Sequence, residues 1–221
     1  MTRAAYAEAF PAVTGRPLIK LPQVAGRAES EIFFDALATN GVDMSATGEA
    51  EDLLEPFSAA LAAALEARRD DLLTDGQLLP GATEALAAVA KLDGVVQSVL
   101  TGSSKPSAVL KLTVFGLDKY VDFDIGGYGS DPYPKGTLLR VAREQAARKH
   151  PDMTFTEHTT VYIADSPRDV DAARIGGARS LAVASGRASA AELREAGADA
   201  VLPDLTDPAA LTALIVRLTQ V

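Results

Sequence analysis

Short apolar runs alternate with helical patterns from residue 82 onward, and this alternation constrains the fold more than any other feature. The runs are bounded by Gly, Pro, Asp and Ser, as buried strands are. Strands are predicted at Val95–Leu100, Val121–Ile125, Thr160–Ala164, Ser180–Ala184 and Ala200–Leu202. Helices are predicted at Ala82–Lys91, Ser104–Leu112, Gly136–Lys149, Val170–Ile175 and Ala190–Ala196. Because repeated strand–helix units connect by right-handed crossovers, the sequence predicts an α/β fold with a parallel sheet.

The first 73 residues have a different pattern, rich in Ala, Glu and Leu, that is helical and needs no strand. Its clearest amphipathic helices are predicted at Glu29–Leu37 and Leu53–Ala67. The turn residues of Asp75–Gly76 and Pro80–Gly81 mark the exit from this region. We therefore predict a helical domain at residues 1–76 and an α/β core at residues 77–221.

The net charge of −9 and the lack of cysteine exclude several classes of function. Nucleic-acid binding needs Lys and Arg gathered on one face, and here they are scattered among acids. No disulfide or thiolate zinc site is available. No apolar run reaches the ~20 residues that span a membrane, and no signal segment is evident, so a cytoplasmic protein without a membrane partner is expected. These features do not specify an oligomeric state.

An acid pair follows one predicted strand, in the segment Val161–Asp169. Asp165 comes directly after the apolar run, where open parallel sheets place their ligands, and Asp169 follows four residues later. Two carboxylates at this turn suit a hard cation such as Mg²⁺, which prefers oxygen ligands. The alternative is an ordinary helix start, in which Asp-Ser-Pro only caps backbone N–H groups.

Two further features come before the acid pair. Thr101, Gly102 and Ser103 follow the strand predicted at Val95–Leu100, where a hydroxyl and successive N–H groups can face a phosphate. A plain Ser/Thr helix cap is the alternative. Lys135 stands at the start of a predicted helix, where a cation opposes the helix dipole, which suggests a role. A solvated surface lysine is the competing interpretation.

With these features in this order, the chain resembles the haloacid dehalogenase-like hydrolases, in particular their phosphoglycolate-phosphatase-like branch, over nearly its whole length. Leu79–Leu86 resembles the entry to the family's core domain, Leu100–Gly102 its second motif, Lys135 the basic residue of its third, and Ala164–Asp169 its fourth. Lys135 lies 34 residues after Thr101, and Asp165 lies 30 residues after Lys135. The helical region is similar to the family's cap, with Ala25, Gly26 and Arg27 on its first loop.

The resemblance implies a Rossmann-like core with a helical cap and a Mg²⁺-dependent phosphatase that acts on a small phosphorylated metabolite such as phosphoglycolate. Thr101 would bind the transferring phosphoryl group, and Lys135 would neutralise its charge. Asp165 would bind Mg²⁺, and Asp169 would be a second metal ligand or would orient Lys135 or a metal-bound water. Gly102 and Ser103 would contact the substrate, and Arg27 would meet an anionic group on it; a solvent-facing arginine of the cap is the competing interpretation.

The family's first motif, an Asp-x-Asp after the first strand that supplies the nucleophile, is missing where it is expected. Asp35 lies in a helical pattern, Asp43 follows a helix-ending turn, and Asp124 falls between the second and third motifs. Without that carboxylate the aspartyl-phosphate route is closed, so the chain as given is expected to be inactive. The first, central strand would also be absent, leaving its two neighbours unpaired.

Three explanations of this gap stay open. In the first, the natural start lies upstream, because residues 1–6 resemble the middle of a helix and a missing strand with its turn needs only about 20 residues. Alternatively, the chain is a non-catalytic metal- or phosphate-binding module or a partner subunit. A dehalogenase or phosphonate hydrolase of the same fold is the third reading, although those chemistries need the same absent Asp.

Overall fold

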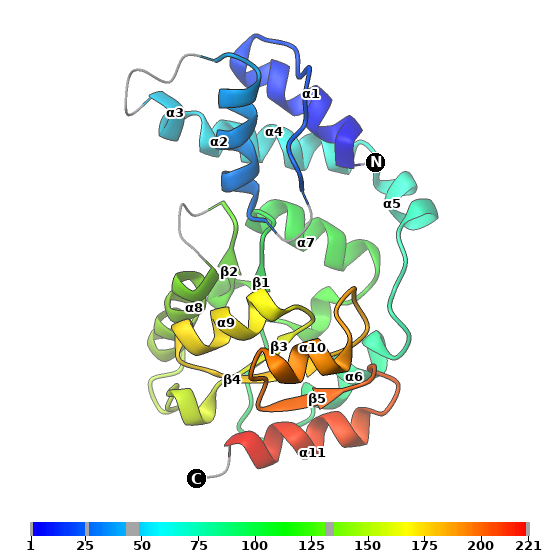
Figure 1. Ribbon diagram of the computed structural model, residues 1–221, viewed down its shortest axis with the longest axis vertical. Helices are drawn as coiled ribbons and strands as arrows, with labels where there is room; N and C mark the ends of the chain where they lie inside the picture. Colours follow the sequence, from blue (N-terminus) through cyan, green and yellow to red (C-terminus); the bar gives the residue numbers. More distant parts are fainter. Residues whose placement is uncertain (1, 25–26, 43–48, 131–134, 220–221) are drawn as a thin grey trace. The chain divides into compact units, whose positions relative to one another are not determined.

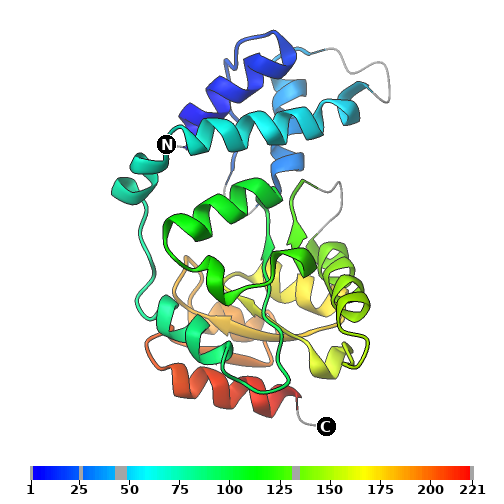
Figure 2. The ribbon, with the colours of Figure 1, turned by 180° about the vertical axis from the view of Figure 1, so that it is seen from behind.

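The computed structural model describes residues 2–24, 27–42, 49–130 and 135–219. The chain is mixed α/β and mostly helical, with two small sheets, as Figures 1 and 2 show from opposite sides. It divides into two compact units. The first comprises Met1–Gln77, Thr101–Asp118 and Tyr128–Tyr133, and the second comprises Leu78–Leu100, Lys119–Gly127 and Pro134–Val221. No described helix is both long and apolar enough to cross a membrane.

The first unit is a helical assembly around an aromatic core. Its helices are α1 (Thr2–Thr14), α2 (Glu29–Thr39), α3 (Glu49–Asp52), α4 (Leu54–Glu66), α5 (Arg69–Asp75) and α7 (Lys105–Val114). Phe33 of α2 stacks on Phe57 of α4 with ring centroids 4.3 Å apart, and Tyr6 of α1 packs against the same Phe57. Leu110 brings α7 into this core. The helices predicted at Glu29–Leu37 and Leu53–Ala67 are confirmed as α2 and α4.

The second unit is built on a three-stranded parallel sheet in the order β3-β4-β5. The strands are β3 (Val161–Ala164), β4 (Arg179–Val183) and β5 (Ala200–Leu202), which confirms the last three predicted strands within a residue at each end. Val161 pairs with Arg179 and Ala164 with Ala182. Leu181 and Val183 then point to one face of the sheet and Ala182 to the other, because side chains alternate along a strand.

Helices cover both faces of this sheet, as right-handed crossovers require. On the face of Leu181, α6 (Ala82–Val89) packs beside α11 (Pro208–Thr219), a helix that the sequence patterns did not predict. On the face of Ala182 lie α9 (Pro167–Gly176) and α10 (Ala190–Glu195), through Val170 and Leu193. Helix α8 (Lys135–Lys149) packs against α9. The carboxyl end of β3, where Asp165 follows, is therefore held by a packed three-layer unit.

The first two predicted strands are wrong over most of their length. Only Leu100–Thr101 forms a strand, β1, which pairs with β2 (Gly127–Tyr128) in a separate two-stranded sheet. A strand needs a ladder of backbone hydrogen bonds to a neighbouring strand. In residues 95–99, the Gln97 carbonyl accepts from Asp122 N–H and the Val99 carbonyl accepts from Gly127 N–H, and these isolated bonds do not form such a ladder. The predicted strand Val121–Ile125 contains instead the 3₁₀ turn η2 (Phe123–Ile125), because the Asp122 side chain accepts from Asp124 N–H and closes a turn.

The predicted single parallel sheet is thus two sheets, and β3 is an edge strand among the described residues. Ile163, in the middle of β3, is 40% exposed, which is unusual for an isoleucine in a strand of an α/β core. Among the described residues, β3 thus combines a free backbone edge with an exposed apolar side chain on the sheet face, and another element could cover both.

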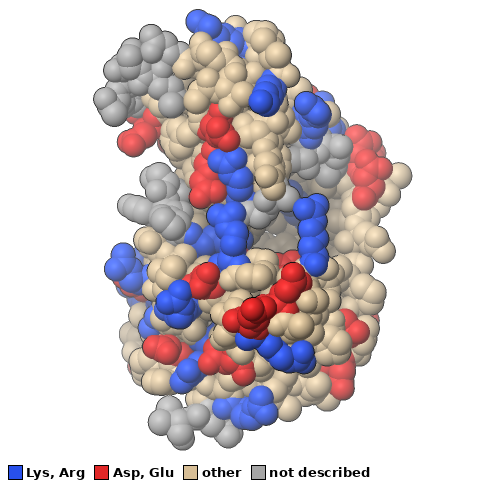
Figure 3. Space-filling view, viewed as in Figure 1, with Lys and Arg blue, Asp and Glu red and all other residues tan. Residues whose placement is uncertain are grey.

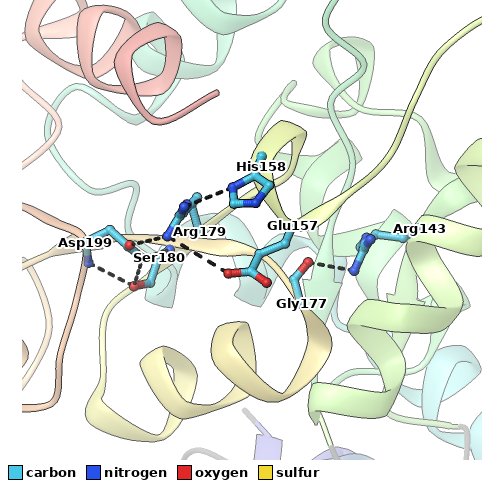
Figure 4. A network of polar contacts seen from close by, with 7 residues as sticks. All are labelled: Arg143, Glu157, His158, Gly177, Arg179, Ser180 and Asp199. Carbon is cyan, nitrogen blue, oxygen red and sulfur yellow. Dashed lines mark hydrogen bonds and ion pairs between the residues drawn. The ribbon is translucent and has the colours of Figure 1, made fainter. Parts of the chain in front are cut away.

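A polar network ties the other end of this sheet together (Figure 4). The Asp199 carboxylate accepts from Ser180 N–H at 2.7 Å and from the Arg179 guanidinium at 3.2 Å. Arg179 also lies 3.0 Å from His158 Nδ1, in the 3₁₀ turn η3 (Glu157–Thr159). A third 3₁₀ turn, η1 (Asp118–Tyr120), precedes η2 in the chain. The network holds the amino-terminal ends of β4 and β5 in register.

Gly81→Ala should destabilise the second unit by at least about 2 kcal/mol, because Gly81 has a φ of 78° and its added Cβ would collide with the Leu205 carbonyl. Gly94→Ala is the matched control, since Gly94 has a φ of 71° with open space around it and should lose about 1 kcal/mol or less. Urea unfolding of both variants measures the difference. Equal losses would contradict the close approach at Gly81.

Candidate functional site

The loop that follows β1 is held by hydrogen bonds within the first unit. Thr101 Oγ1 accepts from Ser103 N–H at 3.1 Å, which leaves the Thr101 hydroxyl proton available as a donor. Ser104 is the N-cap residue of α7, although its side chain makes no capping hydrogen bond, and Pro106 lies in the first turn, as the sequence predicted. The Ser103 carbonyl accepts from Gly129 N–H at 2.9 Å, beyond β2. The loop therefore presents the Thr101 hydroxyl close to the start of a helix, an arrangement that suits an anion.

The start of α2 lies directly against this loop, although the two are about 75 residues apart in sequence. Glu29 N–H donates to the Gly102 carbonyl at 2.6 Å, and Ser30 N–H donates to the Gly129 carbonyl at 2.8 Å. A Cβ on Gly102 would collide with the Arg27 carbonyl, so only glycine permits this approach of the two backbones. Gly102 thus has a steric role in addition to the predicted substrate contact.

Arg27 makes intramolecular contacts at its guanidinium. Its Nη1 lies 2.9 Å from Asp35 Oδ2, and its Nη2 donates to the Glu31 carbonyl at 3.1 Å. The side chain stays 25% exposed, so it can still reach solvent. The neighbouring residues Ala25 and Gly26, which the family resemblance placed on the same loop, lie outside the described residues.

In the second unit, Asp169 is the best-connected carboxylate of the predicted site. Its Oδ1 accepts from Lys135 Nζ at 2.8 Å and from the Tyr162 hydroxyl at 3.2 Å, and its Oδ2 accepts from the Ser166 hydroxyl at 2.6 Å. Ser166 is also the cap of α9, with Pro167 at the first helical position. The structure therefore brings Lys135, at the start of α8, to the acid pair. Residues 131–134, which precede Lys135 in the predicted motif, lie outside the described chain.

The two carboxylates differ in their electrostatic environment. Partial burial raises the pKa of Asp165, and the adjacent Asp169 carboxylate raises it further. Burial also acts against the charge of Asp169, but hydrogen bonds from Lys135 and Ser166 outweigh it and hold the pKa of Asp169 below its ordinary value. The same acid and burial raise the pKa of the Tyr162 phenol, so Tyr162 donates to Asp169 as a neutral hydroxyl. Asp165 is thus a carboxylate that a nearby cation would stabilise.

Sequence reasoning missed two residues at this site. Tyr162 was read only as part of the apolar strand, although a strand tyrosine three residues before the acid points toward the same end of the sheet. Gly186 follows β4, and a Cβ there would lie 2.9 Å from Asp165 Oδ2. A glycine shortly after the next parallel strand was the available signal, since neighbouring parallel strands end at one edge.

The predicted site residues fall in both units. Arg27, Thr101, Gly102 and Ser103 belong to the first unit, and Lys135, Asp165 and Asp169 belong to the second. Within the first unit the structure brings residue 27 to the loop of Thr101 through the backbone. Within the second unit it brings Lys135 to Asp169. Figure 3 shows acidic and basic side chains interspersed on the displayed face, without a large basic patch.

The acid pair fits a hard divalent cation in its chemistry. It offers oxygen donors alone, and two carboxylates whose mutual repulsion a cation would relieve. Among the described residues, no group of three or more His, Cys, Asp or Glu side chains is arranged to hold a metal ion. Mg²⁺ does not need such a cage, because it usually keeps several waters and a substrate phosphate in its shell.

Comparisons with known proteins identify the fold. A sequence profile described as haloacid dehalogenase-like hydrolase matches residues 7–174. A hydrolase from Pseudomonas syringae has 21% identity and a TM-score of 0.59, over 97% of this chain and 91% of that chain. A family IA, variant 3 HAD hydrolase from Entamoeba histolytica HM-1:IMSS has 15% identity and a TM-score of 0.57, over 97% and 92%.

A third solved structure, described as a predicted phosphatase from Clostridium acetobutylicum, has 18% identity and a TM-score of 0.50, over 98% of this chain and 90% of that chain. At 15 to 21% sequence identity, the similarity between this chain and these solved structures shows a shared fold. A comparison with curated proteins gave no match.

Lys135→Met should destabilise the protein by about 2 kcal/mol at neutral pH, because it leaves the Asp169 carboxylate, 7% exposed, without its cation. The folded pKa of Asp169 is depressed, so the contribution of the pair is present above the ordinary aspartate pKa and is lost as the pH falls through the folded value. The gap between wild type and variant should therefore narrow in acid, as urea unfolding at several pH values would measure.

The control for this prediction is Arg174→Met, which removes a guanidinium charge from an exposed ion pair with Asp171 on α9. This variant should change the free energy of unfolding by less than about 0.5 kcal/mol. A Lys135→Met variant as stable as wild type at neutral pH would show that the buried pair contributes little.

Proposed function

The chain belongs to the haloacid dehalogenase-like hydrolases, and we propose that within this family it is a Mg²⁺-dependent phosphatase fold whose substrate is a small phosphorylated metabolite, such as phosphoglycolate. The contact of Lys135 with Asp169 beside Asp165 carries the proposal. Phosphoryl transfer is catalysed mainly by positioning and by cations placed against the phosphoryl oxygens. Lys135 provides one positive charge, and Asp165, at the end of β3, would hold the Mg²⁺ that provides the other.

We assign different tasks to the two carboxylates. Asp165 would hold Mg²⁺, which when bound supplies positive charge to the phosphoryl oxygens. Both oxygens of Asp169 already accept hydrogen bonds, from Lys135, Tyr162 and Ser166, which supports an orienting role for Asp169 over direct metal binding. Lys135, fixed by Asp169, would then point its remaining N–H donors at the phosphate.

The loop after β1 would also contact the phosphoryl group. The Thr101 hydroxyl is available as a donor, since its oxygen already accepts from Ser103 N–H. Gly102 and Ser103 would contribute their backbone. Arg27 would meet an anionic part of the substrate, in exchange for its contacts with Asp35 and Glu31, and the helical region at residues 1–76 would act as the cap that selects the substrate.

We further propose that these 221 residues do not turn over substrate, because, among the described residues, no aspartate stands where the family's first motif places its nucleophile. Asp35 lies on α2 and Asp124 lies in the 3₁₀ turn η2, where Lys149 pairs with it, while Asp43 is outside the described residues. The separation of β1-β2 from β3-β4-β5 and the exposed Ile163 on the free edge of β3 support the absence of one strand.

A non-catalytic metal- and phosphate-binding protein is the second candidate, and the missing carboxylate is the observation that favours it. Turnover separates the two. The 221-residue chain should bind inorganic phosphate in the presence of Mg²⁺ and release no p-nitrophenol from p-nitrophenyl phosphate. Mg²⁺-dependent release would contradict the proposed lack of a nucleophile, and a failure to bind phosphate would contradict the site.

Asp165→Asn should weaken Mg²⁺ binding at least about tenfold, because it replaces a charged ligand by a neutral amide. Isothermal titration calorimetry with MgCl₂ measures this. Asp171→Asn is the matched control, since Asp171 lies on α9 with its side chain 58% exposed and no role in the site. An Asp165→Asn variant that titrates like wild type would remove Asp165 from the metal site.

A further inference from the structure

Two charged residues of the first unit, Glu29, which is buried, and Lys111, which is partly buried, have no part in the assigned site. Glu29 is only 6% exposed, at the first position of α2. Partial burial lowers the pKa of Lys111, in the last turn of α7, while the Glu29 carboxylate acts in the opposite direction. Charged side chains are almost never buried unless they are paired or hydrogen-bonded. Their contacts therefore indicate what they do.

Glu29 contacts the loop after β1 with both its backbone and its side chain. Its Oε2 accepts from Ser104 N–H at 2.8 Å, and its own N–H donates to the Gly102 carbonyl at 2.6 Å. Ser104 is fully buried, so its N–H has no access to water and needs this acceptor. One residue thus holds the loop at two points on either side of Ser103.

Lys111 contacts the same loop at Ser103, between the two residues that Glu29 contacts. Its Nζ donates to Ser103 Oγ at 2.8 Å, eight residues back along the chain. Helical side chains lean toward the amino-terminal end, so the ammonium group is directed toward the start of α7, where the helix dipole is unfavourable to a cation. A partly buried lysine in this place is unfavourable unless an anion compensates it, and the Glu29 carboxylate supplies a negative charge nearby.

We propose that Glu29 and Lys111 are positioning residues that fix residues 101–104 in the conformation that receives a phosphate. Glu29 engages Ser104 N–H and Lys111 engages Ser103 Oγ, while the Thr101 hydroxyl proton stays available as a donor. The two charges also offset each other. Without Lys111, the Glu29 carboxylate would repel a phosphate dianion approaching the loop.

The inference rests on the proposed function in one respect, namely that the loop receives a phosphate. The positioning itself is a property of the free protein and can be measured without any ligand. The test therefore has one arm for the loop and one arm for the phosphate.

In the ligand-free protein, ¹H–¹⁵N spectra report on the amides of Gly102, Ser103 and Ser104. Lys111→Met and Glu29→Ala should move these three resonances and speed their hydrogen exchange, whereas Glu29→Gln, whose amide oxygen still accepts from Ser104, should leave them close to wild type. Lys20→Met is the control, because Lys20 is an exposed lysine of the same unit. If the three amides respond to Lys111→Met and Glu29→Ala no more than to Lys20→Met, the inference is wrong.

In the second arm, calorimetry measures the affinity for inorganic phosphate with Mg²⁺ present. Lys111→Met and Glu29→Ala should each weaken phosphate binding by about tenfold or more, while Glu29→Gln should stay within about threefold of wild type, because a preserved hydrogen bond preserves the loop. A general loss of packing would not distinguish Glu29→Ala from Glu29→Gln in this way. Wild-type affinity in Lys111→Met would overturn the positioning role.

Two outcomes need a second measurement. If Lys111→Met does not fold, the Glu29→Gln/Lys111→Met variant, which buries no unpaired charge, takes its place in both arms with the same expectation for Ser103. If the wild type itself does not bind phosphate, the proposed function fails, and the amide spectra alone decide whether Glu29 and Lys111 position the loop.

Discussion

The Asp169 carboxylate is the group on which the polar arrangement of the second unit depends. Its hydrogen-bond donors come from three elements: Lys135 from the start of α8, Tyr162 from β3 and Ser166 from the cap of α9. A buried carboxylate is stable only when such donors surround it. The same contacts that keep Asp169 charged therefore fix the lysine and leave Asp165, at the end of β3, as the carboxylate that can take a metal ion.

The structure also shows which parts of this arrangement were readable from the sequence. The strands β3, β4 and β5 and the start of α9 were predicted because apolar runs, a capping serine and a proline at the first helical position are local signals. Residues 95–99 have the same apolar pattern and form no strand, because a strand also depends on partners that the pattern does not encode. Helix α11 was missed although it buries Leu211 and Ile215.

The contacts of Glu29 and Lys111 could not have been predicted in the same way. In the sequence, Glu29 has the pattern of an ordinary acid in the first turn of a helix. Lys111 has the pattern of a residue on the polar face of another helix. Their common partner is the loop of residues 101–104, about 75 residues after Glu29, and only the folded chain brings them together. Gly186 beside Asp165 is a similar case.

Metal binding by Asp165 is the central claim about the site, and paramagnetic broadening of amide resonances by Mn²⁺ tests it directly. Mn²⁺ at low concentration should first broaden the amide resonances of Asp165, Ser166 and Gly186. A competing acid pair exists at Asp122 and Asp124, which Lys149 already neutralises. Broadening that begins at Asp122 and Asp124 and spares Gly186 would contradict the assignment of the metal site.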